Sequence, residues 1–197
     1  MAKIKHTKTE MKAQREALQR FERFLPMLQL KKQQLQAEIL RIESELDENQ
    51  RKNEQAEAEL APWVKLFSEA AADALREHVE PEEVVLDQGN IAGVDIPLFR
   101  EVRFKSAALD LFETPPWFDD GIEMLRRLRS LRVERATLRQ QRDAIAEELR
   151  VTAQRVNLFE KVKIPETRDN IRVIKVFLGD EQTAAVVRGK FAKSRAA

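Results

Sequence analysis

The feature that most constrains the fold is a heptad repeat of apolar residues in the first third of the chain. Counting on from Leu18 in alternating steps of three and four residues meets fourteen positions, of which eleven are apolar and three are Lys32, Asn49 and Asn53. The positions are Leu18, Phe21, Leu25, Leu28, Lys32, Leu35, Ile39, Ile42, Leu46, Asn49, Asn53, Ala56, Leu60 and Trp63. This spacing predicts a long helix with one narrow apolar seam. A helix from about Lys8 to Leu60 would be roughly 80 Å long.

A second seam lies near the other end of the chain. The same steps from Leu128 to Phe159 meet seven apolar residues in ten positions. The positions are Leu128, Leu131, Arg135, Leu138, Arg142, Ile145, Leu149, Thr152, Val156 and Phe159. Thr114 is a candidate N-cap, and prolines at 115 and 116 suit a first helical turn. We therefore expect a second long helix that runs to about Leu178, where Gly179 would end it.

Neither helix can bury its stripe alone, so each needs a partner. Because the intervening segment returns the chain, we favour an intramolecular antiparallel pair over a parallel homodimer along each stripe. Polar residues within the seams would fix the register at some cost in stability. They are Lys32, Asn49, Asn53, Arg135 and Arg142.

The middle of the chain, residues 61–114, has a different pattern. The stretch PWVKLFSEAAADALREHV predicts a short helix, and β-branched residues with alternation at Val94, Ile96 and Leu98 predict a β-hairpin that turns near DQGN. Pro97 indicates an edge strand. The expected fold is mainly α: a long antiparallel two-helix coiled coil with a small middle region of short helix and hairpin. Its expected divisions are 1–60, 61–114, 115–180 and a basic tail at 181–197.

The composition offers no catalytic centre. The chain of 197 residues has no cysteine, five scattered glycines and two histidines far apart, His6 and His78, which we interpret as exposed. Asp119 and Asp120 fall in a predicted first helical turn, where acids complement the helix dipole. We therefore expect no catalytic residues, no metal site and no cofactor. No signal-type segment or membrane-length apolar run is visible, so a soluble protein is expected.

Basic residues gather at both ends of the chain, although the net charge is only +1. They are Lys3, Lys5, Lys8 and Lys12 at the start, and Arg188, Lys190, Lys193 and Arg195 at the finish. In an antiparallel pair both ends lie at one pole. They are then either solvated termini or a positive tip aimed at an acidic or polar partner.

Three stretches resemble the D-subunit family of the V/A-type rotary ATPases, and more its bacterial branch than the archaeal or vacuolar ones. The first is TKTEMKAQREALQRFERFLPMLQLKKQQLQ, with its run from Leu25 to Lys32. The second is QRVNLFEKVKIPETRDNIRVIKVFL, with Arg155-Val156-Asn157 and Ile164-Pro165. The third is GVDIP at 93–97. Their order and spacing cover nearly the whole chain.

The resemblance implies a non-catalytic central rotor shaft that transmits torque between a catalytic head and an ion-translocating membrane ring. The implied partners are the catalytic and regulatory head subunits of A and B type, the small F-type subunit of the central stalk, and the funnel subunit on the membrane ring. It implies no cofactor, no nucleic-acid partner and no direct membrane insertion. The implied location is cytoplasmic, peripheral to the membrane as part of the V-type ATPase complex.

Particular residues follow from this interpretation. Pro26 and Pro165 are candidate helix bends, because each removes a backbone hydrogen bond. Six residues are candidate partner contacts: Lys31, Lys32, Arg155, Asn157, Arg188 and Lys190. The alternative is a coiled-coil scaffold or tether without a motor role. A nucleic-acid-binding stalk ranks lower, because the overall charge is balanced.

Overall fold

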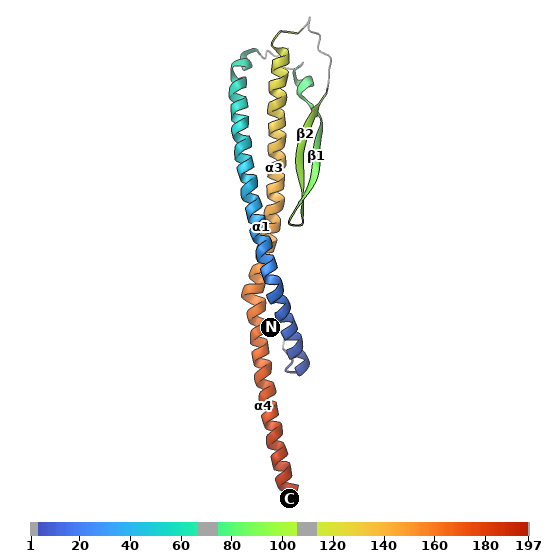
Figure 1. Ribbon diagram of the computed structural model, residues 1–197, viewed down its shortest axis with the longest axis vertical. Coiled ribbons are helices and arrows are strands. Elements are labelled where there is room, and N and C mark those ends of the chain that lie inside the picture. The colour runs from blue at the N-terminus through green and yellow to red at the C-terminus, as the bar shows by residue number, and fades with distance from the viewer. Residues whose placement is uncertain (1–3, 67–74, 106–113, 197) are drawn as a thin grey trace. The chain divides into compact units, whose positions relative to one another are not determined.

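The computed structural model describes residues 4–66, 75–105 and 114–196. Its elements are α1 (Lys8–Leu60), a 3₁₀ turn η1 (Ala61–Leu66), the strands β1 (Pro81–Ile91) and β2 (Val94–Phe104), α3 (Phe118–Leu158), a π-helical turn η2 (Phe159–Lys163) and α4 (Ile164–Ala196). The long helices from the two ends of the chain pack together, with a short helix and a hairpin between them in sequence (Figure 1). The predicted fold class is therefore confirmed.

Residue contacts divide the chain into two compact units. The first unit combines residues up to Gln33 with those from Arg150 onward, and the second contains Gln34–Leu149. The second unit holds the hairpin and the facing parts of α1 and α3.

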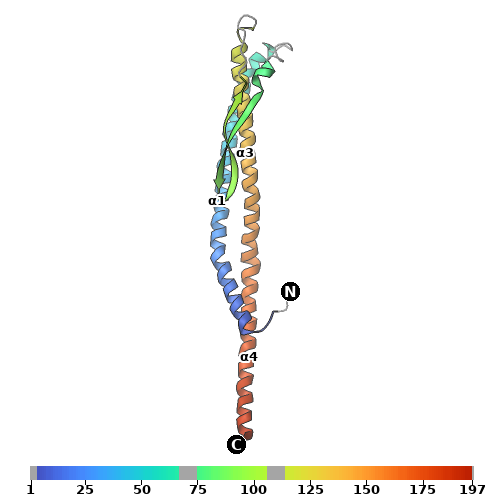
Figure 2. The same ribbon diagram turned by 90° about the vertical axis from the view of Figure 1, so that its right-hand side faces the viewer.

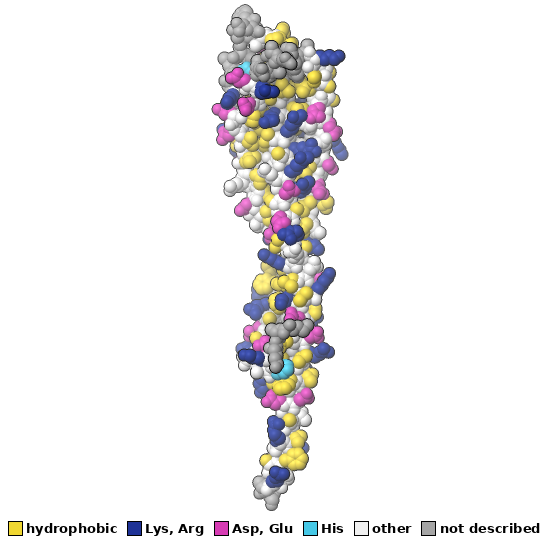
Figure 3. Space-filling model, turned by 180° about the vertical axis from the view of Figure 1, so that it is seen from behind, with side chains coloured by type: hydrophobic (Ala, Val, Ile, Leu, Met, Phe, Trp, Pro, Cys, Tyr) yellow, Lys and Arg dark blue, Asp and Glu magenta, His cyan; other side chains and the backbone are white. Residues whose placement is uncertain are grey.

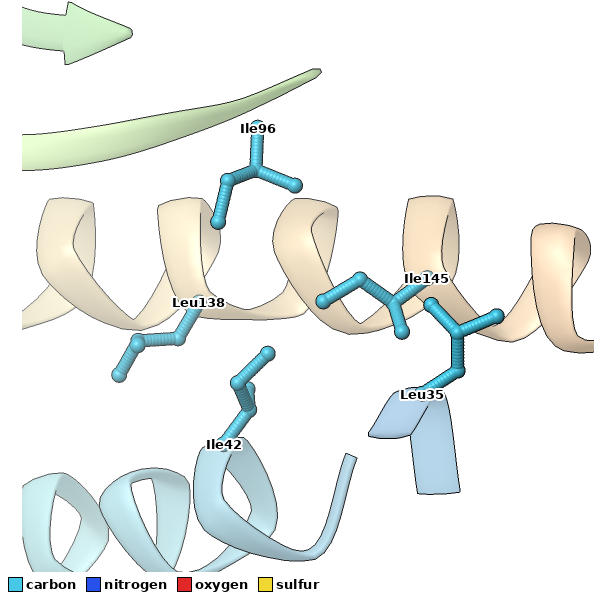
Figure 4. Packing of buried hydrophobic residues seen from close by; sticks show 5 residues of the cluster. All are labelled: Leu35, Ile42, Ile96, Leu138 and Ile145. Carbon is cyan, nitrogen blue, oxygen red and sulfur yellow. The ribbon is translucent and has the colours of Figure 1, made fainter. Parts of the chain in front are cut away.

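The core of the second unit is the predicted seam. Leu35 and Ile42 from α1 meet Leu138 and Ile145 from α3, and Ile96 from β2 completes the cluster (Figure 4). Leu35, Ile42 and Ile145 are completely buried. All fourteen positions of the first seam, and all ten of the second, are buried or half-buried. The heptad spacing therefore identified the contact stripe of each helix correctly.

Polar contacts across the second unit show that α1 and α3 run antiparallel. Asn49 Nδ2 donates to Glu134 Oε2 at 2.9 Å and to the Leu131 carbonyl at 3.2 Å. Further along α1, Glu57 pairs with Arg132 at 3.1 Å and Glu59 with Arg127 at 3.2 Å. The partner number falls as the α1 number rises, so the predicted antiparallel pairing is confirmed in this unit. Asn49 makes the kind of cross-helix contact that specifies register.

The Glu57–Arg132 contact predicts a pH effect. Hydrogen bonds from Arg132 and then Asn53 hold the pKa of Glu57 below its ordinary value. Because the folded-state pKa is lowered, the stabilisation is present above the ordinary pKa and lost as the pH falls through the folded value. We expect the unfolding temperature to fall more between about pH 5 and about pH 3 in the unmodified chain than in Glu57→Gln. Circular dichroism melts test this, and identical pH dependence in both chains would contradict it.

The β-hairpin forms as predicted, but its turn lies further along the chain. The last pair of the antiparallel ladder is Ile91 with Val94, so Ala92 and Gly93 form the loop and DQGN belongs to β1. Both loop residues have positive φ, 51° at Ala92 and 83° at Gly93. A two-residue hairpin loop of this kind requires that backbone, which glycine adopts without strain. The prediction of a turn near DQGN is therefore wrong.

Asn90 lies at the end of β1 and stabilises the two-residue loop. Its hydrogen bonds explain why a residue typical of turns occurs within the strand. Its Oδ1 accepts a hydrogen bond from the Gly93 N–H at 3.0 Å, and its Nδ2 donates to Asp95 Oδ1 at 2.6 Å. The asparagine thus acts beside the turn and not within it.

Gly93→Val should destabilise the hairpin by about 1–2 kcal/mol, because a β-branched residue is strained at positive φ. Gly179→Ala is the control, since it lies within a helix with nothing within 4 Å of an added methyl group. That change should stabilise by about 0.5–1 kcal/mol. Urea unfolding followed by circular dichroism measures both, and effects of the same sign would contradict the assignment of the turn.

Two side chains of α3 attach the hairpin. Gln141 is 4% exposed and donates from Nε2 to the Pro97 carbonyl at 2.5 Å. Arg126 donates from Nε to the His78 carbonyl at 3.0 Å and from a terminal nitrogen to the Lys105 carbonyl at 2.9 Å. Its guanidinium also lies 5.2 Å from the centroid of the Phe104 ring. These contacts hold the hairpin and the segment before it on one face of α3.

The start of α3 differs from the prediction. The helix begins at Phe118, and Pro115 and Pro116 lie in the turn before it, where the Phe118 N–H donates to the Pro115 carbonyl at 3.0 Å. Two consecutive prolines favour extended backbone at the first of them, which delays the helix. Asp119 and Asp120 do lie in the first turn, as expected.

The predicted short helix is seen in part. Residues 75–79 are helical and 61–66 form the 3₁₀ turn, whereas 67–74 lie outside the described residues. Leu75, Phe118 and Ile122 form a second small core. His78 is half-buried and its ring meets Phe118 edge-on, with centroids 6.0 Å apart. The interpretation of His78 as an exposed residue is therefore wrong, and its role here is packing.

The C-terminal helix does not end at Gly179. α4 continues to Ala196, and Thr183 Oγ1 donates to the Gly179 carbonyl at 3.0 Å one turn on. A single helical glycine costs only about 1 kcal/mol, and the residues after it, including Ala184, Ala185 and Arg188, are adequate helix formers. Gly179 is thus an interior residue of the helix and not its end.

Candidate interaction surface on the paired terminal helices

The first unit is an antiparallel pair made from the start of α1 and from the end of α3 with η2 and α4. Glu22 pairs with Arg168 at 2.7 Å, and the rings of Phe21 and Phe159 lie 5.1 Å apart. Nearer the start of the chain, the rings of His6 and Phe177 lie 4.7 Å apart. The start of the chain therefore lies beside Phe177 and not beside residues 188–195, so the two basic ends are offset along α4 and do not meet at one pole as predicted.

Pro165 lies directly after the π-helical turn. The Ile164 N–H bonds to the Phe159 carbonyl, so one residue more than usual is enclosed in that turn. A proline inside a helix has no N–H and its ring crowds the carbonyl four residues earlier, and a widened turn gives that ring room. Thr167 Oγ1 donates to the Lys163 carbonyl at 2.6 Å and so supplies a partner within the widened turn. The helix thus passes through Pro165 with its apolar face still on α1.

Large apolar side chains on this pair remain exposed after the helices have packed. On α1 they are Phe24, Met27 and Leu30, with exposed fractions of 48%, 61% and 56%. On the partner segment they are Leu158, Val162, Val173, Val176, Phe177, Val186, Val187 and Phe191. Large exposed apolar residues that gather on one unit indicate a candidate site of protein contact. The pair therefore presents a second apolar surface besides its own seam.

The last part of α4 extends beyond the start of α1 and has no helix beside it in this unit (Figures 1 and 2). From Gly179 to Arg195, every residue except Ala184 is exposed. Val173, Phe177, Ala184, Val187 and Phe191 follow one another at steps of three, four and seven residues, so they share one face of the helix. This "outer stripe" lies about a third of a turn around the helix from Ile174 and Leu178, which continue the seam towards α1.

The same end of α4 carries the predicted positive charge. Arg188, Lys190, Lys193 and Arg195 are all exposed, and no acidic residue follows Glu181. Figure 3 shows basic and hydrophobic side chains interspersed at this end. The end of α4 thus combines exposed apolar side chains with cations. This combination is typical of surfaces that bind a polar, partly acidic site on a partner.

The structure separates the six predicted contact residues into two groups. Lys31 and Lys32 are half-buried near the seam, while Arg155 and Asn157 are exposed on α3. Arg188 and Lys190 form the second group. They lie on α4, about 50 Å from Arg155 and Asn157 along the helix, at about 1.5 Å per residue. The prediction that these six residues contact partners is not tested by this geometry, and neither is a bend at Pro26 or Pro165.

The outer stripe was missed from the sequence. Its signal was available, because counting on in steps of three and four past Phe177 meets Ala184, Val187 and Phe191. The count from Leu128 ended at Phe159, and the helix itself was expected to end at Gly179.

No metal-binding group of three or more histidine, cysteine or acidic residues occurs within 4–66, 75–105 and 114–196. In those same ranges no helix has the length and apolar character needed to cross a membrane.

These features define a mainly helical protein with paired terminal helices, a hairpin attached to α3, and large exposed apolar residues on the first unit. A family model for the D subunit of ATP synthase matches residues 10–194. The chain therefore belongs to the D-subunit family of ATP synthases, as its resemblance implied.

Curated relatives agree along their whole length. The D subunit of a V-type ATP synthase from Borreliella burgdorferi is 45% identical over 194 residues, which cover 98% of this chain and 95% of that protein. Proteins of the same description from Chlamydia pneumoniae and Chlamydia muridarum are 34% and 33% identical, over 98% of this chain and 92% and 96% of theirs. All three come from bacteria, the branch that the sequence resembled.

Proposed function

We propose that the chain is the non-catalytic central rotor shaft of a V-type ATPase or ATP synthase. It would transmit torque between the head that hydrolyses or synthesises ATP and the membrane ring that moves ions. Membership of the D-subunit family supports this role. As part of that complex the chain would be cytoplasmic and peripheral to the membrane.

One observation carries the proposal: the distribution of exposed apolar residues. Of the sixteen large hydrophobic residues that are exposed in the described ranges, eleven lie in the first unit and five in the second. A two-helix rod in water gains nothing from such residues, whereas a rod enclosed by other subunits buries them. The paired terminal helices are accordingly the part that would enter the head.

The mechanism follows from the asymmetry of this unit. The two helices expose different side chains, apolar at the outer stripe and charged around it, so a surrounding ring of subunits meets a different surface on each side. Rotation of the shaft then changes which catalytic interface contacts the apolar side. Each interface shifts between open and closed states because its contact energy with the shaft differs between them.

Partners are assigned by analogy with the family. Catalytic and regulatory subunits of A and B type would surround the first unit, the small F-type subunit would bind along the shaft, and the funnel subunit would seat it on the membrane ring. Lys31, Lys32, Arg155, Asn157, Arg188 and Lys190 are candidate contacts in this arrangement. Pro26 and Pro165 would bend the helices and so make the shaft eccentric.

Native mass spectrometry of the complex, isolated gently through a tag on this chain, tests the proposal. One copy of the chain with one small companion subunit and a six-membered nucleotide-binding head is the expected composition. A homodimer, or a complex without any nucleotide-binding partner, would overturn the rotor role and favour the scaffold or tether.

A further inference from the structure

The seam of the second unit contains a polar layer between apolar ones. It consists of Asn49 and Asn53 on α1 and Arg135 on α3. Asn49 is 3% exposed and Asn53 7%, so both amides are more than nine-tenths buried. The layer lies between Leu46 and Ala56, which occupy the adjoining seam positions of α1. The two amides are thus enclosed by the helix pair.

The amide donors of this layer are paired, but the acceptors are not. Asn49 Nδ2 bonds to Glu134 and to the Leu131 carbonyl, and Asn53 Nδ2 donates to Glu57 Oε1 at 3.0 Å. In contrast, the Oδ1 atoms of both asparagines and Nε of Arg135 are buried and have no hydrogen-bond partner among the described residues. A buried polar atom left in this state forfeits its hydration without compensation. The layer therefore needs a further species that both donates and accepts hydrogen bonds.

The charges around the layer select that species. Arg135 is joined by Arg132, and the two acids that receive the amide hydrogen bonds are Glu57 and Glu134. Two positive and two negative side chains leave no net charge to hold an ion. The species must therefore be neutral and must both donate and accept hydrogen bonds. Water fits, because it can donate to Asn49 Oδ1 and Asn53 Oδ1 and accept from Arg135 Nε.

We propose that Asn49, Asn53 and Arg135 bind internal water between α1 and α3, and that this hydrated layer sets the register of the second unit. A helix offset that placed either amide against Ile145 or Leu138 would bury its polar atoms without hydrogen-bond partners, so the layer disfavours that offset. The proposal concerns the chain itself and does not depend on its role in a rotary machine.

The test is nuclear magnetic resonance of the full-length chain, perdeuterated and labelled with ¹⁵N, so that no α-proton resonates at the water frequency. Rotating-frame spectra distinguish a cross-relaxation peak between water and an amide proton from chemical exchange, because the two have opposite signs. We expect cross-relaxation peaks from long-lived water at the side-chain amides of Asn49 and Asn53. The exposed amide of Gln36 should show none. The signals are assigned by their loss in Asn49→Leu and Asn53→Leu.

Two variants give a matched comparison on α3. Arg135→Leu removes the donor that holds the water, and should abolish the water peaks of both asparagines. Arg139→Leu removes an exposed arginine one turn away and should leave them unchanged. Absence of water peaks at Asn49 and Asn53 in the unmodified chain would overturn the proposal, and this result requires no variant to fold. Peaks that persist in a folded Arg135→Leu chain would remove Arg135 from the site and overturn the proposal as stated.

Discussion

Ile42→Ala should lower the free energy of unfolding by about 3 kcal/mol, within the range of about 2–5 kcal/mol for such deletions in a packed core. Ile42 is completely buried and meets Leu138 and Ile145 across the seam. Because Ile42 packs against residues of both facing elements, α3 and β2, these neighbours cannot close the resulting cavity without losing contacts elsewhere. Urea unfolding followed by circular dichroism measures the change.

Leu40→Ala is the matched control for this experiment. Leu40 lies two residues away on the same helix, but it is outside the seam and 67% exposed. Its replacement should change the stability by at most about 0.5 kcal/mol, as for other surface substitutions. Equal losses in the two variants would mean that the seam is not the contact surface in solution.

Phe191→Asp should weaken binding of the chain to the proposed nucleotide-binding head by roughly 10- to 100-fold, as expected when a large apolar side chain in an interface is lost. Phe191 is 66% exposed and belongs to the outer stripe of α4. The isolated chain should keep its helix content and its unfolding temperature, because this side chain contributes nothing to the core. Affinity measurements on the reconstituted complex, beside melts of the free chain, test both statements.

Gln182→Asp adds the same negative charge to the same helix, half a turn away from the outer stripe. It should leave binding nearly unchanged. If both variants bind as tightly as the unmodified chain, the outer stripe is not part of the interface.

Much of this fold could be predicted because heptad spacing is a property of many residues together. Polar residues at three seam positions, Lys32, Asn49 and Asn53, do not break the heptad period. The first helix was therefore predicted from about Lys8 to Leu60, and α1 has these bounds. The hairpin was predicted for the same reason, from several alternating residues.

The misplaced boundaries depended on single residues. The turn was placed near DQGN because asparagine and glycine are typical loop residues, yet the ladder continues past that stretch and the positive φ values fall on Ala92 and Gly93. Gly179 was predicted to end the helix. A glycine ends a helix only where it adopts the left-handed backbone conformation that follows the last turn. Local propensity is weak, and the surrounding helix or ladder overrides it.

The outer stripe could not be recognised as an interaction surface from sequence alone. Apolar residues at helical spacing predict a buried face, and nothing in the pattern says which molecule buries it. Only the position of α1, whose helix begins at Lys8, shows that Val187 and Phe191 lie beyond the intramolecular pair. The contacts of Arg155 and Asn157 stay predictions for a similar reason, because their predicted partners are other chains.

Rotation of the chain inside its head is the most direct test of the proposed role. The chain has no cysteine, so Glu82→Cys, at an exposed position of the hairpin, provides one attachment point for a bead. With the head fixed to a surface and ATP supplied, the bead should turn stepwise in one direction. A bead that stays still while the same complexes hydrolyse ATP would contradict the rotor role.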